Sequence, residues 1–222
     1  MAERPILFSD AMVRAILAGA KTQTRRVVRR NDVVLGPSRG MHLGQGESAW
    51  HIGRGRYSIS GTGAPPEFVK RGPYGAPGDR LWVREAWGAR RALDFTDWHR
   101  GSLRGHVEAP PGTVVDFRAD YVEQQESCFW RPSIHMPRWA SRITLEVVDV
   151  RVERVQSISE EDARAEGVSP EPSAALADSP VGLTAREAFR ELWDSIDERP
   201  GCSWADDPWV WVVNFRRVEV RR

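Results

Sequence analysis

A long alternation of apolar and polar residues in the second half of the chain constrains the fold more than any other feature. Apolar residues occupy every second position from Ile143 to Val147, and the alternation continues, shifted by one residue, from Val148 to Val152. Side chains two residues apart lie on the same face of a strand, so this run predicts one long strand with a single β-bulge. Long bent strands of this kind are typical of small barrels.

Further strands and three short helices are expected around this strand. Capping boxes predict the starts of two helices, one at Ser159 with Asp162 three residues later and one at Thr184 with Glu187. The elements do not alternate as βαβ units, so the sequence predicts an α+β fold with a small, mainly antiparallel sheet or barrel. The other strands are expected at about 21–28, 80–85, 115–121 and 209–220, and the helices at 10–17, 159–167 and 184–196.

The length of the chain favours one domain. A chain of 222 residues suits a single core, so we expect residues 1–222 to fold as one unit with long loop insertions. Eleven of the nineteen glycines lie between residues 36 and 78, which predicts a glycine-rich insertion there. A second irregular stretch is expected at about 88–112.

The charge balance argues against some classes of function. With 32 basic and 31 acidic residues the net charge is only +1, unlike that of a protein that coats nucleic acid with a uniformly basic face. No apolar run approaches the roughly 20 residues that span a bilayer, so we expect a cytoplasmic protein that does not contact a membrane. Neither the histidines nor Cys128 and Cys202 have the spacing of metal ligands, and we expect no metal and no cofactor.

Six short blocks follow one another in a recognisable order. They include Gly-Ala-Lys-Thr-Gln-Thr-Arg (19–25), Pro-Gly-Asp-Arg-Leu-Trp-Val-Arg (77–84), Ile-Ser-Glu-Glu-Asp-Ala-Arg-Ala-Glu-Gly (158–167) and Trp-Val-Val-Asn-Phe (211–215). In this order the chain resembles the ASCH family. Leu-Trp-Val-Arg-Glu-Ala-Trp (81–87) and Met-Pro-Arg-Trp-Ala-Ser-Arg-Ile (136–143) look like its longer branch, which is common in phage and prophage genomes.

The resemblance implies a PUA-like β-barrel flanked by short helices, with a site for a modified nucleoside or RNA. Some compact family members are amidohydrolases that remove the acetyl group from N4-acetylcytidine and rely on a lysine, a threonine and a glutamate. Their Lys-Thr-x-Thr segment matches Lys21 and Thr24 here. Their glutamate, in the helix after the long strand, points to Glu166, with Glu160 and Glu161 as nearby alternatives.

These three residues suit amide hydrolysis, which needs a nucleophile and a base that activates it. We expect Thr24 to attack the acyl carbon, Lys21 to act as base and then as acid, and Glu166 to orient Lys21 or the substrate amine. A lysine acts as a base only when its pKa is lowered, and Arg25 and Arg26 are placed to contribute to that. The sequence therefore predicts an amidohydrolase acting on N4-acetylcytidine or a related modified nucleoside.

Other polar and aromatic residues are candidates for binding the substrate. Arg25 and Arg26 begin a run of arginines that would attract a phosphate backbone, although such a run also suits a solvated face. Arg84 and Glu85 form either a cross-strand salt bridge or, through Arg84, a contact with a phosphate or carbonyl. The candidates for stacking on a base, with core packing as the alternative, are Trp82 and Trp139.

Two other functions remain open for the same residues. One is a non-catalytic RNA-binding module whose cleft reads a base by stacking and hydrogen bonds. The other is a ribonuclease in which a lysine in a basic cleft stabilises a phosphorane. By composition alone, the Lys-Thr-x-Thr segment also suits a surface turn, and Glu166 suits a solvated helix residue.

Overall fold

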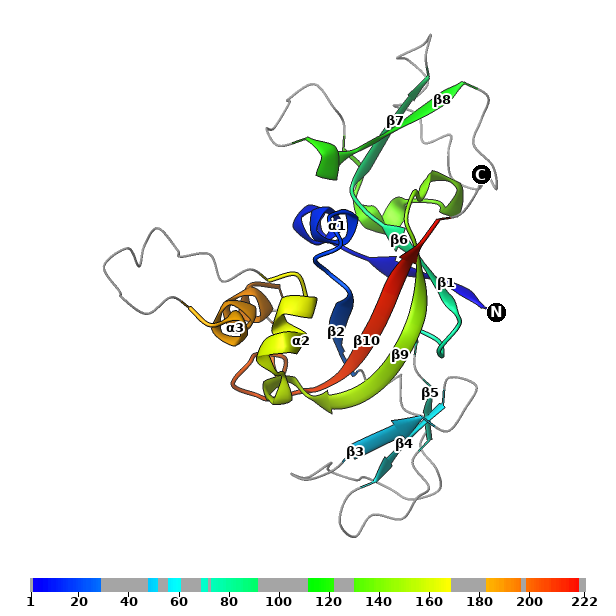
Figure 1. Ribbon diagram of the computed structural model, residues 1–222. Coiled ribbons are helices and arrows are strands. Elements are labelled where there is room, and N and C mark those ends of the chain that lie inside the picture. Colours follow the sequence, from blue (N-terminus) through cyan, green and yellow to red (C-terminus); the bar gives the residue numbers. More distant parts are fainter. Residues whose placement is uncertain are drawn as a thin grey trace, which may run out of the picture.

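A mixed five-stranded sheet forms the centre of the computed structural model (Figure 1). The strand order is β1-β6-β9-β10-β2, with β1 and β6 parallel and the other neighbours antiparallel. The strands are β1 (Glu3–Leu7), β2 (Gln23–Val27), β6 (Arg80–Arg84), β9 (Thr144–Arg154) and β10 (Trp209–Val218). The structure describes residues 2–28, 48–51, 56–60, 69–71, 73–91, 112–121, 130–168, 183–196 and 199–219.

The fold is α+β, as predicted. The described strands form an open sheet, because β1 and β2 are its two edges and do not pair with each other. Whether the chain forms one domain stays a prediction. No helix in the described part of the chain is both long and apolar enough to cross a membrane.

The predicted bulge lies in β9. Asn214 of β10 lies opposite Asp149, whereas Phe215 lies opposite Val147, so Val148 has no counterpart on β10. An unpaired residue bends its strand and increases the local twist, and β9 curves along β10 in Figure 1. The shift in the apolar alternation therefore marks the position of the bulge correctly.

Strand β1 was not expected from the sequence. It contains Pro5, which cannot donate a hydrogen bond and is tolerated because β1 is an edge strand. The carboxylate of Asp79 fixes its start by accepting hydrogen bonds from Ala2 N at 2.7 Å and Ala76 N at 3.2 Å. Although burial opposes the shift, these two hydrogen bonds and the charge of Arg4 hold the pKa of Asp79 below its usual value.

Three α-helices pack on the sheet: α1 (Asp10–Leu17), α2 (Glu160–Ala165) and α3 (Ala185–Ile196). The predicted capping box at Thr184 is confirmed, whereas at Ser159 only one of the two bonds of a capping box forms. The Ser159 hydroxyl accepts the Asp162 N–H at 3.1 Å. At α3 the bonds are reciprocal, because Glu187 N donates to the Thr184 hydroxyl at 3.2 Å and Thr184 N donates to the Glu187 carboxylate at 2.8 Å.

The two faces of β10 belong to different cores. Trp211, Val213 and Phe215 pack in a core that includes buried residues of α1. Val210 and Val212 pack in a second core with residues of α2 and α3. Since paired residues of neighbouring strands point to the same face, this division assigns each side chain of β2 to one core or the other.

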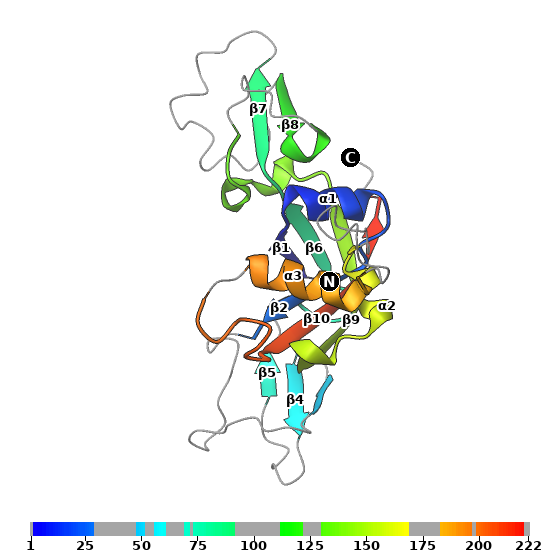
Figure 2. The ribbon, with the colours of Figure 1, turned by 90° about the vertical axis from the view of Figure 1, so that its left-hand side faces the viewer.

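Two small sheets extend from opposite ends of the central sheet (Figures 1 and 2). The first, β3-β4-β5, lies within the glycine-rich stretch that was predicted as a loop insertion. The second pairs β7 with β8, so the stretch predicted to be irregular begins as a strand. Apart from residues 73–78 and Gly112, the remainder of both stretches lies outside the described residues. The bounds are β3 (Ser48–His51), β4 (Arg56–Ser60), β5 (Val69–Arg71), β7 (Trp87–Arg91) and β8 (Thr113–Phe117).

Short 3-10 turns connect several of these elements. The predicted strand at 115–121 ends at Phe117, because the next three residues form such a turn. The turns are η3 (Arg118–Asp120), η4 (Ser133–His135), η5 (Arg138–Ala140) and η6 (Val155–Ser157).

A buried ion pair joins the end of β6 to the segment before β9. Glu85 is fully buried, and its two oxygens accept hydrogen bonds from Arg142 Nε and Nη2 at 3.0 Å each. Arg142 also donates to Asp120 at 2.7 Å. Glu85 therefore pairs with Arg142 and not with its neighbour Arg84. The salt bridge considered between Arg84 and Glu85 is thus wrong.

Replacing Arg142 with methionine is expected to lower the free energy of unfolding by about 3 kcal/mol, because it leaves the Glu85 carboxylate buried without its partner. Burial raises the pKa of Glu85 above its ordinary value of 4.5, with Arg142 opposing the shift. The loss should therefore shrink as the pH falls through the raised pKa of the Glu85 carboxyl group, where it takes up a proton, and grow as the pH rises. Urea unfolding at several pH values measures this.

Arg216→Met is the matched control. Arg216 pairs with Glu146 at 2.8 Å, but its side chain is 67% exposed, so this substitution should cost less than about 1 kcal/mol. Equal losses in the two variants would contradict the structural role of the Glu85–Arg142 pair.

Candidate functional site

The Lys-Thr-x-Thr segment is held against the end of α2. After α1, Gly19 adopts a positive φ of 77°, and Lys21 then forms an isolated β-bridge with Glu166. Thr22 N donates to the carbonyl of Ala165 at 2.8 Å, which fixes the same contact one residue further on. These backbone bonds bring residues far apart in the sequence to one point before any side chain is considered.

Lys21 and Glu166 form a buried ion pair. The Nζ of Lys21 lies 2.7 Å from Glu166 Oε2 and donates at 2.7 Å to the backbone carbonyl of the same residue. The two residues are only 2% and 5% exposed. Burial lowers the pKa of Lys21 from its usual value; the pair with Glu166 opposes this, and the charges of Arg26 and Arg25 add to it.

Among the described residues, Lys21 contacts Glu166 and not the two alternatives, Glu160 and Glu161. The carboxylate of Glu160 accepts hydrogen bonds from Ala185 N at 3.0 Å and Arg186 N at 3.1 Å, so it caps the start of α3. No described contact joins Glu161 to Lys21, whose Nζ bonds are made with Glu166.

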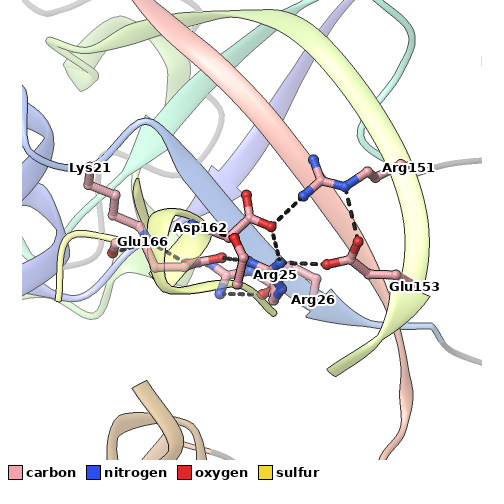
Figure 3. A network of polar contacts seen from close by, with 8 residues as sticks. Lys21, Arg25, Arg26, Arg151, Glu153, Asp162 and Glu166 are labelled. Atoms are coloured by element: carbon pink, nitrogen blue, oxygen red, sulfur yellow. Dashed lines mark hydrogen bonds and ion pairs between the residues drawn. The ribbon is translucent and has the colours of Figure 1, made fainter. Parts of the chain in front are cut away.

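Arg25 is the centre of the polar network drawn in Figure 3. Its Nη1 lies 3.3 Å from Glu166 Oε1, while its Nη2 lies 2.5 Å from Glu153 and 3.1 Å from Asp162. Arg151 connects the same two carboxylates, at 3.0 Å and 2.8 Å. The side chain of Arg25 is fully buried and holds Glu166 in place, and substrate binding by Arg25 stays a prediction.

The Glu166 carboxylate is therefore fixed from both sides, with Lys21 on Oε2 and Arg25 on Oε1. A carboxylate taken out of water keeps its charge only when it is paired and hydrogen-bonded. Glu153, Asp162 and Arg151 were not predicted as parts of the site. Their only sequence signals were polar positions in the long strand and a helix cap.

Thr24 lies on the other face of β2. It pairs with Val213, which belongs to the core beside α1, whereas Arg25 pairs with Val212 of the second core. Thr24 is 1% exposed, and its hydroxyl has no hydrogen-bond partner among the described residues. The structure therefore shows no hydrogen bond between Thr24 and Lys21.

Phe8 connects the surroundings of Lys21 and Thr24. Its ring belongs to the core that Thr24 faces, and its centroid lies 5.8 Å from the Nζ of Lys21. The guanidinium of Arg26 lies 5.2 Å from the same centroid. The Lys21 ammonium is thus in contact with groups on both sides of β2, with Glu166 on one and Phe8 on the other.

A cavity of ≈310 Å³ opens beside the ion pair. Its polar lining consists of Glu166 and three arginines, and its apolar lining comes largely from α3. A second hollow of ≈620 Å³ adjoins it and is lined by Phe8 and residues of β1. Thr24 does not line either of these two spaces. The residues shared by both linings are Met12, Arg26, Val27, Tyr74 and Ile196.

The remaining substrate-binding candidates lie elsewhere. Arg84 lies over the ring of Trp82, 4.7 Å from its centroid, and donates to the carbonyl of Ile134 at 3.3 Å. Trp139 packs edge-on against Trp87 with centroids 5.9 Å apart, in a third apolar cluster. Neither these side chains nor Glu85 lines the two hollows described above. Arg26 was predicted to bind substrate, and it lines the cavity. Its hydrogen bonds go to backbone carbonyls, and no carboxylate of the described residues pairs with it.

No protein-family model, curated protein or solved structure matches this chain. Among the described residues, no group of three His, Cys, Asp or Glu side chains is arranged to hold a metal ion.

Substituting alanine for Gly167 tests how tightly the ion pair is packed. Gly167 has a φ of 82°, and an added Cβ would lie 2.9 Å from the Cβ of Lys21 and 3.0 Å from that of Ala15. The unfolding free energy should fall by more than the roughly 1 to 2 kcal/mol that a left-handed alanine costs.

Gly19→Ala is the matched control, because Gly19 has a similar φ of 77° and nothing within 4 Å of the added Cβ. The unfolding free energy of this variant should fall only by the roughly 1 to 2 kcal/mol that a left-handed alanine costs. Thermal or urea unfolding measures both variants, and an equal loss would mean that Lys21 has room to move.

Proposed function

We propose that the chain is an amidohydrolase of the ASCH type that removes the acyl group from N4-acetylcytidine or a related modified nucleoside. The observation that carries this proposal is the buried Lys21–Glu166 pair, 2.7 Å apart beside a cavity of small-molecule size. These are two of the three residues that the family resemblance identifies. A buried lysine beside a cavity, with its pKa lowered by burial, is a candidate for a catalytic base.

The proposed reaction begins at Thr24. Its buried hydroxyl has no partner among the described residues, and in this scheme it attacks the acyl carbon once the bound substrate brings the two together. Lys21, as the neutral amine, takes the hydroxyl proton while the new C–O bond forms and a tetrahedral oxyanion develops. Collapse of this intermediate breaks the C–N bond, and Lys21 returns the proton to the departing amine. Water then hydrolyses the acyl-threonine ester by the same route.

Glu166 has a positioning role in this scheme. Because Arg25 holds one carboxylate oxygen and Lys21 binds the other, the lysine amine is fixed at a constant place throughout the reaction. Thr24 and Lys21 have to come within hydrogen-bonding distance when substrate is bound. Catalytic hydrogen bonds often form only in the complex.

A PUA-like barrel is part of the proposal. Arg26 on β2 donates from Nη2 to the carbonyl of Leu7 on β1 at 2.7 Å, so a side chain bridges the two edges of the open sheet. Together with the curved β9, this bridge supports a sheet that is rolled towards closure (Figure 1).

Thr24→Val removes the hydroxyl and keeps the shape of the side chain, so it should reduce turnover by at least about a thousandfold. Conversion of N4-acetylcytidine to cytidine, followed by ultraviolet absorbance, measures the rate. Thr22→Val is the matched control, because Thr22 is exposed and two residues away; it should retain the wild-type rate. Undiminished turnover by Thr24→Val would refute the assignment of the nucleophile.

RNA binding without catalysis is the second candidate, favoured by the three arginines in the lining of the cavity. An inactive wild-type protein that retains labelled RNA in a salt-dependent way would favour it. RNA shortened by the wild-type protein but not by Lys21→Ala would favour a ribonuclease.

A further inference from the structure

Four charged side chains line the 310 Å³ cavity: the guanidinium groups of Arg25, Arg26 and Arg199 and the carboxylate of Glu166. Arg25 is paired with Glu166, Glu153 and Asp162, so its charge is compensated, and Arg199 has an interaction of its own. The charge in this lining that an anionic ligand would complement is therefore that of Arg26.

The contacts that Arg26 makes are with uncharged groups. Its guanidinium donates to two backbone carbonyls, Leu7 at 2.7 Å and Arg25 at 3.5 Å, and lies over the ring of Phe8. No carboxylate of the described residues forms an ion pair with it. Arg25 is the opposite case, since three carboxylates surround its buried side chain.

The position of Arg26 also fits a bound anion. It lines both hollows and so lies where they meet. A guanidinium has five N–H donors in a planar fork, and the two contacts with carbonyls leave donors available on the remaining edge. Such a fork binds two oxygens of a phosphate at once, which a carbonyl or hydroxyl group of a nucleoside cannot offer.

We propose that the substrate carries a phosphate, as a nucleoside monophosphate, and that Arg26 binds this group. The inference rests on the proposed function, which supplies the nucleoside part. The volume of the cavity lies at the lower end of the range for small-molecule sites, which suits one nucleotide and not a stretch of RNA. Glu166, which lines the cavity and binds Lys21 behind it, then receives the base at one side, and Arg26 receives the phosphate at the other.

Calorimetric titration with cytidine and with cytidine 5′-monophosphate tests this without any acyl group. The wild-type protein should bind the monophosphate at least about tenfold more tightly than the nucleoside, and the preference should weaken with added salt. Arg26→Gln should abolish the preference, and Arg26→Lys should retain part of it, because the charge remains while the fork is lost. Circular dichroism establishes that both variants are folded.

Arg190→Gln is the matched control for the change in charge, because Arg190 lies on the exposed side of α3 and lines neither hollow. It should keep the wild-type preference. Equal affinity of the wild-type protein for nucleoside and monophosphate would overturn the proposal, as would a preference that survives in Arg26→Gln. Tighter, Arg26-dependent binding of a cytidine-containing oligonucleotide than of the monophosphate would overturn the assignment to a mononucleotide.

These outcomes are separate from those of the proposed function. Loss of the phosphate preference with normal hydrolysis of N4-acetylcytidine leaves the amidohydrolase and removes the phosphate site. Arg26-dependent binding of the monophosphate with no hydrolysis of either acylated compound leaves the phosphate site and removes the amidohydrolase.

Discussion

The ion pair between Lys21 and Glu166 is the interaction on which the candidate site depends. It joins the turn after α1 to the residue that follows α2, two segments 145 positions apart, at 2.7 Å and almost out of contact with water. Two charges lose several kcal/mol each on leaving water, and their mutual attraction offsets this only with good geometry and further hydrogen bonds. Arg25 and the carbonyl of Glu166 provide those bonds.

Such a pair is weak evidence for stability. Apolar side chains of similar volume would pack in the same place at no greater cost in free energy. Its position beside a cavity, and the direction in which burial moves the pKa of Lys21, are the properties that a base in amide hydrolysis requires. The network around Arg25 supports this role of Lys21. Arg25 holds the Glu166 carboxylate, and that carboxylate holds the Lys21 amine in place (Figure 3).

Local patterns predicted the local structure well. The bulge at Val148 and the helix starts at Ser159 and Thr184 follow from residues close together in the sequence. Strand β1 was missed because an edge strand with Pro5 has little signal of its own and depends on Asp79, far along the chain. The ion pairs of Arg25 were not foreseen, because its three carboxylate partners lie 128, 137 and 141 positions away and charge in a sequence does not reveal such pairing. The contact between Lys21 and Glu166 was predicted from the family resemblance, and the structure has it. A family resemblance carries spatial information that composition lacks.

A crystal structure of the protein with cytidine bound tests most directly whether Thr24 shares a site with the lysine and the carboxylate. Cytidine should occupy the cavity beside α3, with its exocyclic nitrogen within hydrogen-bonding distance of the Lys21 amine and the Thr24 hydroxyl directed towards it. A pyrimidine bound in another part of the molecule, or a Thr24 hydroxyl still enclosed beside Val213 and remote from the ligand, would contradict the catalytic assignment.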